Sequence, residues 1–153
     1  MTPDEPTAPR LLVVDDSNSA RRLLQGVLFG LGASPESVRT AADSAEAQRL
    51  VAEWKPGVVL LDVELRREGD APAPRRSRAS VPAALLNGDE LGRQLLRANP
   101  GLPIVLVTAL DQEHPRIQQL RGRGAVEVLM KPVRASQVHE VLLRLGIRLP
   151  SPK

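Results

Sequence analysis

Acidic, hydroxyl and basic side chains stand at the ends of four short apolar runs in this chain. The run LLVV precedes Asp15 and Asp16, VVLL precedes Asp62, IVLV precedes Thr108, and VEVLM precedes Lys131. If these runs are parallel strands of one sheet, the side chains meet at the edge where open α/β sheets bind ligands. A group of carboxylates with one lysine and one hydroxyl suits a divalent cation and a phosphoryl group.

The aspartates are expected to need a cation. Unpaired negative charge at the end of a buried strand is costly, and Mg²⁺ is typically held by one or two carboxylates, water and phosphate oxygens. A carboxylate beside Mg²⁺ can also act as a nucleophile and form an aspartyl phosphate. Lys131 would then supply positive charge to the phosphoryl group, and Thr108 would supply a hydroxyl.

Each of these residues has a simpler explanation when it is taken alone. Asp15 and Asp16 could cap a helix that begins at Ser17, Asp62 could be a strand-end turn residue, and threonine is common in strands. The chemical interpretation rests on the fact that all of them close apolar runs, one after another along the chain.

The apolar runs belong to a longer alternation of strand-like and helix-like segments. Strands are predicted at 11–15, 37–41, 58–62, 104–108 and 126–130. Helices are predicted at 17–31, 44–54, 89–98, 115–122 and 135–145. Strands separated by helix-length connections favour parallel βαβ units with right-handed crossovers. We therefore expect an α/β three-layer sandwich with a five-stranded parallel sheet.

Composition limits the function further. The 153 residues are 42% apolar and 25% charged, which is ordinary for one globular domain. The absence of cysteine excludes disulfides, thiolate metal sites and thiol catalysis. No run approaches the roughly 20 apolar residues of a membrane span, so we expect a cytoplasmic protein without membrane insertion. The pI is about 10.1 but the net charge is only +3, which gives weak support for nucleic-acid binding.

The few aromatic and histidine residues are assigned no chemistry. Trp54 and Phe29 are expected to pack in or near the core. His114 and His139 are expected to face solvent on helices outside the site.

Together, LLVVDDS, VVLLDVEL, NGDEL, PIVLVTA and VLMKP resemble the CheY-like receiver domain of two-component response regulators, over about residues 10–145. The resemblance implies a flavodoxin-like (βα)5 fold. It also implies a phosphoprotein that takes its phosphoryl group from a histidine kinase or, in a phosphorelay, from a histidine phosphotransfer protein. Such a domain signals through an effector protein, which the sequence does not identify, and catalyses only its own phosphorylation and dephosphorylation.

The resemblance also implies a role for each site residue. Asp62 is the phosphoacceptor, Thr108 is the switch hydroxyl that moves toward the phosphoryl group, and Lys131 pairs with that group. The peptide bond before Pro132 is expected to be cis. Mg²⁺, or Mn²⁺ in its place, would be held by the acidic cluster and one backbone carbonyl: Asp15, Asp16 as the more direct ligand, Asp62, and the carbonyl of Glu64.

Three departures from the family pattern affect the switch. The Met-Pro that usually follows the phosphoacceptor strand is absent, and the glycine-containing turn, Asn87-Gly88, is delayed by an insertion. Val128 replaces the usual aromatic partner of the switch threonine, so the usual aromatic coupling cannot operate. Glu64 and Leu110 stand at the two positions that flank the phosphoryl group and tune its hydrolysis. An acidic residue at 64 could repel the phosphodonor, reach the metal or orient water, and the sequence does not choose among these.

The insertion reads RREGDAPAPRRSRASVPAALL, over about 66–86. A structureless stretch of this length is uncommon inside a compact domain, and its composition is typical of a solvated, disordered segment. The alternative is a docking arm for an acidic partner or, with less support, for nucleic acid or a membrane surface. The residues that would form it are Arg66, Arg67, Arg75, Arg76 and Arg78.

We expect a flexible N-terminal tail at 1–9, a receiver domain at 10–147 and a C-terminal tail at 148–153, acting as a stand-alone receiver. A receiver cut from a larger regulator is the alternative, and dimerisation is left open. An aspartyl-phosphate phosphohydrolase would need a second aspartate where Glu64 stands, and a cap domain. A nucleic-acid-binding module using the arginine segment would lose affinity steeply with salt and would survive loss of Asp62.

Overall fold

The protein is described by a computed structural model over residues 8–65, 87–122 and 127–149. A five-stranded parallel sheet forms its centre, in the order β2-β1-β3-β4-β5. The strands are β1 (Leu11–Val14), β2 (Val38–Ala41), β3 (Val58–Asp62), β4 (Ile104–Thr108) and β5 (Glu127–Met130). This is the flavodoxin-like strand order, in which the direction of winding reverses between β1 and β3.

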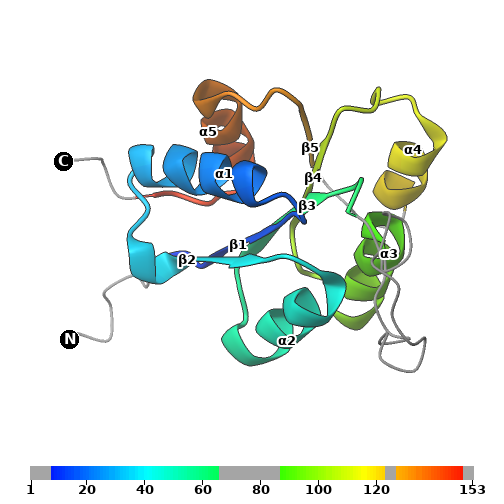
Figure 1. Ribbon diagram of the computed structural model, residues 1–153, viewed down its shortest axis with the longest axis horizontal. Coiled ribbons are helices and arrows are strands. Elements are labelled where there is room, and N and C mark those ends of the chain that lie inside the picture. The colour runs from blue at the N-terminus through cyan, green and yellow to red at the C-terminus, as the bar shows by residue number, and fades with distance from the viewer. Residues whose placement is uncertain (1–7, 66–86, 123–126, 150–153) are drawn as a thin grey trace, which may run out of the picture.

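Helices cover both faces of the sheet. They are α1 (Asn18–Gly30), α2 (Ser44–Trp54), α3 (Gly88–Ala98), α4 (Pro115–Gly122) and α5 (Ala135–Arg144), with a short 3-10 helix, η1 (Pro35–Ser37). Buried side chains of α1 and α5 share one hydrophobic cluster, and those of α2, α3 and α4 share the other. Figure 1 shows α1 and α5 above the strands and α2 below them. The predicted three-layer α/β sandwich is therefore confirmed.

Strands β1, β3 and β4 are apolar up to their last residue because both faces of the sheet are covered there, whereas the edge strands β2 and β5 carry polar side chains such as Arg39 and Glu127. Along β1, Leu12 and Val14 point into the cluster beneath α2 and α3, while Leu11 and Val13 point into the cluster beneath α1 and α5. All four side chains are buried. Continuous apolar runs of this kind are the sequence pattern of parallel strands buried on both faces.

Helix beginnings are fixed by local polar side chains. The side chain of Ser17 accepts a hydrogen bond from the Ala20 N–H at the start of α1. Asn87 forms a capping box with Glu90 at the start of α3. Because Ser17 provides the helix cap, the aspartate pair before it is not needed for capping.

The predicted elements agree with the observed ones to within one residue at each end, but the prediction fails in two other respects. The turn η1 was not predicted, and it delays the second strand to Val38. The prediction that Phe29 packs near the core is wrong, since this side chain is 38% exposed. Leu24 and Leu28 face the sheet from α1. Phe29 directly follows Leu28, so its side chain points about 100° away from that of Leu28 around the helix axis.

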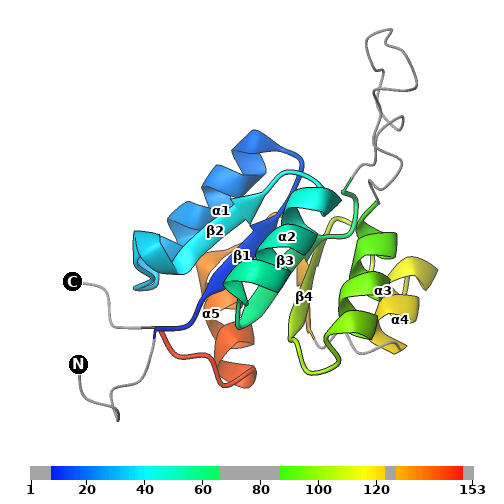
Figure 2. The ribbon, with the colours of Figure 1, turned by 90° about the horizontal axis from the view of Figure 1, so that it is seen from below.

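The insertion leaves and returns at one point of the fold. The Gly88 N–H donates a hydrogen bond of 3.1 Å to the carbonyl of Leu65, and in Figure 2 the end of β3 and the start of α3 lie side by side. A side chain at Gly88 would collide with the backbone carbonyls of Asp62 and Val63. The residues between, including Arg66, Arg67, Arg75, Arg76 and Arg78, lie outside the described part of the chain. Within the described part, no helix is long and apolar enough to cross a membrane.

Candidate functional site

The predicted acidic residues come together at the carboxyl ends of β1 and β3. One carboxylate oxygen from each of Asp15, Asp16 and Asp62 lies within 4.8 Å of the others. Asp15 and Asp62 are buried, with 1% and 3% of their surface exposed, while Asp16 is exposed. The cluster therefore reaches from the core to the surface at the point where the strand order reverses.

Asp15 has one carboxylate oxygen with a partner and one without. Its Oδ1 accepts a hydrogen bond from the Ser17 N–H at 2.8 Å. Its Oδ2 is buried without a hydrogen-bond partner among the described residues, and its nearest cation, Lys131 Nζ, is 3.7 Å away. Because an unsatisfied buried carboxylate oxygen is costly, this atom fits the ligand set of a divalent cation, which prefers oxygen ligands.

Asp62 is held in a defined orientation at the end of β3. Its Oδ1 accepts a hydrogen bond from the Glu64 N–H at 3.0 Å and lies 3.5 Å from Lys131 Nζ. Burial raises the pKa of Asp62 to about 6, and the neighbouring Asp15 carboxylate adds to this rise, while Lys131 opposes it. A buried carboxylate with a raised pKa beside a second carboxylate is typical of a functional site.

Lys131 approaches both buried aspartates from the end of β5. Its side chain is 31% exposed, so the ammonium group can reach solvent as well as the cluster. Its backbone N–H donates to the carbonyl of Thr108 at 2.8 Å, which joins the ends of β4 and β5, and its peptide bond with Pro132 is cis. The lysine thus supplies positive charge at the acidic cluster from a fixed backbone position.

Thr108 contacts Glu64 rather than Asp62. The Thr108 hydroxyl donates a hydrogen bond of 3.1 Å to Glu64 Oε1, and the Ala109 N–H donates one of 2.8 Å to the same oxygen. The Leu110 N–H donates to Thr108 Oγ1 at 2.8 Å. Burial opposes the charge on Glu64, but the bonds from Ala109 and Thr108 lower its pKa below the usual value. This bridge between the ends of β3 and β4 was not predicted, because the sequence left three roles open for Glu64.

An ion pair beside the site was also missed. Arg116, at the start of α4, makes a bidentate contact with Asp89 of α3, and its Nη2 donates to the carbonyl of Val63 at 2.8 Å. The hydrogen bond to Asp89 raises the pKa of Arg116. The contact ties α3 and α4 to the backbone directly after Asp62. No local sequence pattern predicts this ion pair, since its two charged residues lie on different helices.

The other predicted residues lie around this centre. Val128 and Leu110 are half-buried and pack against the cluster that includes α4 residues. His139 is exposed, as predicted, whereas His114 is half-buried, with its Nδ1 accepting a hydrogen bond from the Arg116 N–H. Glu64 as a metal ligand through its carbonyl stays a prediction.

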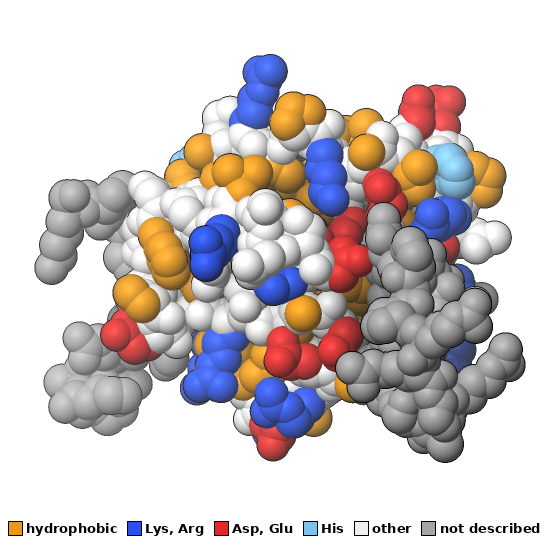
Figure 3. Space-filling view, in the orientation of Figure 1, with side chains coloured by type: hydrophobic (Ala, Val, Ile, Leu, Met, Phe, Trp, Pro, Cys, Tyr) orange, Lys and Arg blue, Asp and Glu red, His pale blue; other side chains and the backbone are white. Residues whose placement is uncertain are grey.

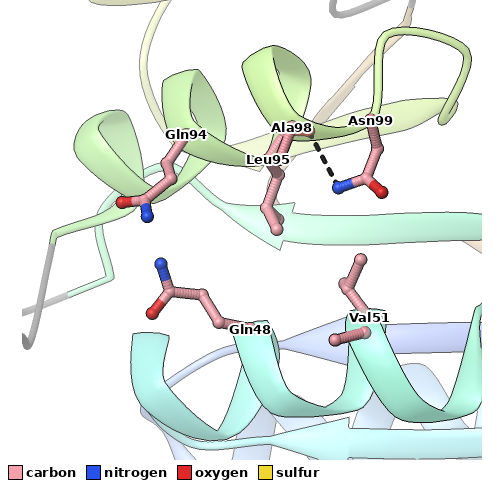
Figure 4. A pocket seen from close by; sticks show the side chains of 7 residues that line it. Gln48, Val51, Gln94, Leu95, Ala98 and Asn99 are labelled. Atoms are coloured by element: carbon pink, nitrogen blue, oxygen red, sulfur yellow. Dashed lines mark hydrogen bonds between the residues drawn. The ribbon is translucent and has the colours of Figure 1, made fainter.

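A separate hollow of about 210 Å³ lies between α2 and α3. Gln48 and Val51 line it from α2, and Gln94, Leu95 and Asn99 line it from α3 and the residue after it (Figure 4). None of its lining residues belongs to the acidic cluster. Figure 3 shows several acidic side chains near the middle of the molecule and others at its edges, with basic side chains spread over the same face.

Comparison with known proteins gives a consistent result. No family model matches the chain. The response regulator MprA of Mycobacterium sp. (strain KMS) is 34% identical over 136 residues, which are 89% of this chain and 48% of that protein. The alkaline phosphatase synthesis transcriptional regulatory protein PhoP of Bacillus subtilis is 31% identical over 146 residues, covering 93% of this chain and 52% of PhoP. The chain thus spans about half the length of the curated relatives it matches.

Solved structures agree with the relatives. The receiver domain of NtrX from Brucella abortus is 28% identical and superimposes with a TM-score of 0.68, over 88% of this chain and 95% of that domain. A CheY-like receiver domain protein from Methanospirillum hungatei shares the fold with a TM-score of 0.69 at 20% identity, over 91% of this chain and 94% of that one.

The fold is that of a flavodoxin-like (βα)5 protein, and a cluster of three aspartates lies at its topological switch point. With the relatives added, the chain is a CheY-like receiver domain of the two-component type.

Proposed function

We propose that this receiver domain accepts a phosphoryl group on Asp62 in a reaction that requires Mg²⁺. The observation that carries the proposal is the position of Asp62. It is a buried carboxylate oriented by a backbone N–H and contacted by Lys131. It belongs to an acidic cluster in which one buried oxygen, Asp15 Oδ2, accepts no hydrogen bond from the described residues. Sequence similarity to response regulators supports the same role.

The proposed reaction is a phosphoryl transfer from a phosphohistidine. A carboxylate oxygen of Asp62 attacks phosphorus, so that an O–P bond forms while the P–N bond of the donor breaks. The bonding electron pair stays with the histidine nitrogen, which is then protonated from solvent. Because the hydrogen bonds to Asp62 from described residues converge on Oδ1, the second oxygen is the better placed nucleophile.

The surrounding residues compensate the charge of the phosphoryl group. Lys131 is already placed between Asp15 and Asp62 and would pair with a phosphoryl oxygen. Mg²⁺, or Mn²⁺, would be held by Asp15, Asp16 and Asp62, with the Glu64 carbonyl as a further ligand, and would supply countercharge to the phosphoryl oxygens.

The partners follow from this role. We propose a histidine kinase or a histidine phosphotransfer protein as the donor and an unidentified effector protein as the receiver of the signal, in the cytoplasm. In this proposal the domain catalyses only its own phosphorylation and dephosphorylation. The receiver domain would extend over 10–147, with the arginine-rich segment 66–86 inserted after Leu65.

The test is the intact mass of the protein after incubation with Mg²⁺ and acetyl phosphate. We expect one phosphoryl adduct in the wild type and none in Asp62→Asn or after addition of a chelator. An adduct that persists in Asp62→Asn would contradict the assignment of the acceptor, and an adduct formed in chelator would contradict the need for a cation.

A further inference from the structure

The carboxylate of Glu64 takes up hydrogen-bond donors that an anion on Asp62 would need. A single oxygen, Oε1, accepts from both the Thr108 hydroxyl and the Ala109 N–H. The direction of the hydroxyl proton is settled by a third contact, because the Leu110 N–H donates to Thr108 Oγ1 and leaves that hydroxyl's only proton for Glu64. Both bonds go to an ionised acceptor and therefore belong to the strong class.

These donors lie beside the phosphoacceptor. Asp62 is paired with Val107 across the β3–β4 ladder, Thr108 is the last residue of β4, and Ala109 follows directly after it. Glu64 spans the same gap, since its N–H donates to Asp62 Oδ1 while its side chain crosses to β4. A phosphoryl group on Asp62, which projects beyond the strand ends, would meet the donors that Glu64 now holds.

We propose that Glu64 is an internal competitor of the phosphoryl group, whose carboxylate occupies the position of a phosphoryl oxygen at Thr108 and Ala109. This inference rests on the proposed function of Asp62. Because the Thr108 hydroxyl has only one proton to donate, it cannot serve both anions, and two anions at this spacing also repel each other. Phosphorylation must then exchange one acceptor for the other.

The exchange needs only a side-chain rotation. Val63 and Leu65, on either side of Glu64, are buried and fix the backbone, whereas the Glu64 side chain is only half-buried. Its carboxylate can therefore turn into water, where it is well solvated, while Thr108 is fully buried and stays inside. The position of residue 64 thereby sets the affinity of the site for a phosphoryl group.

The experiment uses beryllium trifluoride, a phosphoryl mimic, titrated with Mg²⁺ into the full chain and followed by calorimetry. The wild type is compared with Glu64→Ala and with Glu64→Gln, which keeps the shape and an oxygen acceptor but removes the charge. We expect the affinity to increase at least tenfold in Glu64→Ala and by a smaller factor in Glu64→Gln. Glu113→Ala, which removes an exposed carboxylate from the loop after β4, should stay within twofold of the wild type.

Unchanged affinity in both Glu64 variants would overturn the proposal. Weaker affinity would also overturn it, and would instead point to help from Glu64 in holding the cation. If Glu64→Ala does not fold, Glu64→Gln alone decides, because equal or weaker binding by that variant refutes competition. An equal gain in Glu113→Ala would show that only net charge matters, and would likewise refute a direct exchange.

A second measurement reports on the contact itself. In NMR spectra, the resonance of the Ala109 amide proton should lie further upfield in Glu64→Ala than in the wild type. When beryllium trifluoride binds, this resonance should reach a similar downfield position in both proteins. No change at Ala109 on removal of the carboxylate would refute the contact. Failure of wild type and variants alike to bind the mimic would overturn the phosphoacceptor function and this inference with it, whereas binding without a gain in the Glu64 variants overturns the inference alone.

Discussion

Replacing Asp62 with asparagine should make the domain more stable in the absence of a divalent cation. Burial and the Asp15 carboxylate raise the pKa of Asp62 to about 6 in the folded state, whereas the unfolded value is about 4. The folded state thus holds a proton more tightly than the unfolded state, so the wild type loses stability as the pH rises from about 4 through 6. Asparagine is uncharged at every pH and avoids this loss.

The magnitude follows from the difference in pKa. About two pH units at 1.36 kcal/mol each give about 3 kcal/mol, which is fully expressed above about pH 7. Asparagine keeps an oxygen that can accept from the Glu64 N–H. We therefore expect the free energy of unfolding of Asp62→Asn at pH 7.5 to be about 2–3 kcal/mol larger than that of the wild type. For a domain of this size, that is a rise in melting temperature of roughly 4–12 °C.

The assay is urea unfolding followed by circular dichroism between pH 4.5 and 8, in chelator and with added Mg²⁺. The advantage of the variant should grow with pH. It should shrink when Mg²⁺ is added, because an ion at ten times its dissociation constant stabilises the wild type by about 1.4 kcal/mol. Asp16→Asn, at the exposed end of the cluster, is the control and should change cation-free stability little. A variant that is no more stable than the wild type at pH 7.5, or a difference independent of pH, would refute the reasoning.

Three further predictions concern the structure around the site. Replacing segment 66–86 with a short glycine-serine linker should leave the melting temperature within about 3 °C, because the Leu65–Gly88 hydrogen bond already closes the chain there; a large drop in calorimetry would show that the segment packs on the domain. Gly88→Ala should cost several kcal/mol or prevent folding, because its Cβ would collide with backbone carbonyls; wild-type stability in urea unfolding would contradict this close approach. Arg116→Lys should lower the free energy of unfolding by about 1 kcal/mol in the same assay, because lysine cannot reproduce the bidentate contact with Asp89. Adding Asp89→Asn to this variant should then lower it little further, and fully additive losses in the double variant would argue against a direct pair.

The sheet and most of its site could be predicted because buried parallel strands leave a clear pattern in the sequence. Each apolar run ends within a residue of the observed strand, so the side chains that follow, such as Asp15 and Asp62, had to share one edge. The same logic failed for Phe29, where an apolar side chain in a helix was assigned to the core without regard to the face it occupies.

The contacts that were missed depend on the direction of side chains rather than on element order. Glu64 was recognised as close to Asp62, but whether its carboxylate points to the metal, to solvent or to Thr108 is decided by the loop geometry after β3. The pair of Asp89 and Arg116 joins two helices whose mutual angle no residue spacing encodes. The order of helices and strands can therefore be predicted from hydrophobic periodicity, whereas the contacts between neighbouring side chains cannot.

The closure of the chain between Leu65 and Gly88 has a practical use in protein engineering. The two residues are joined by a hydrogen bond. The fold therefore contains an insertion site at which both ends of an inserted sequence are held close together. Each doubling of an inserted length costs only about 0.6 kcal/mol in loop-closure entropy, and a guest domain with neighbouring termini would add little strain. A fluorescent protein inserted at this site would begin three residues after Asp62 in the sequence. Its fluorescence could report the phosphorylation state of the domain.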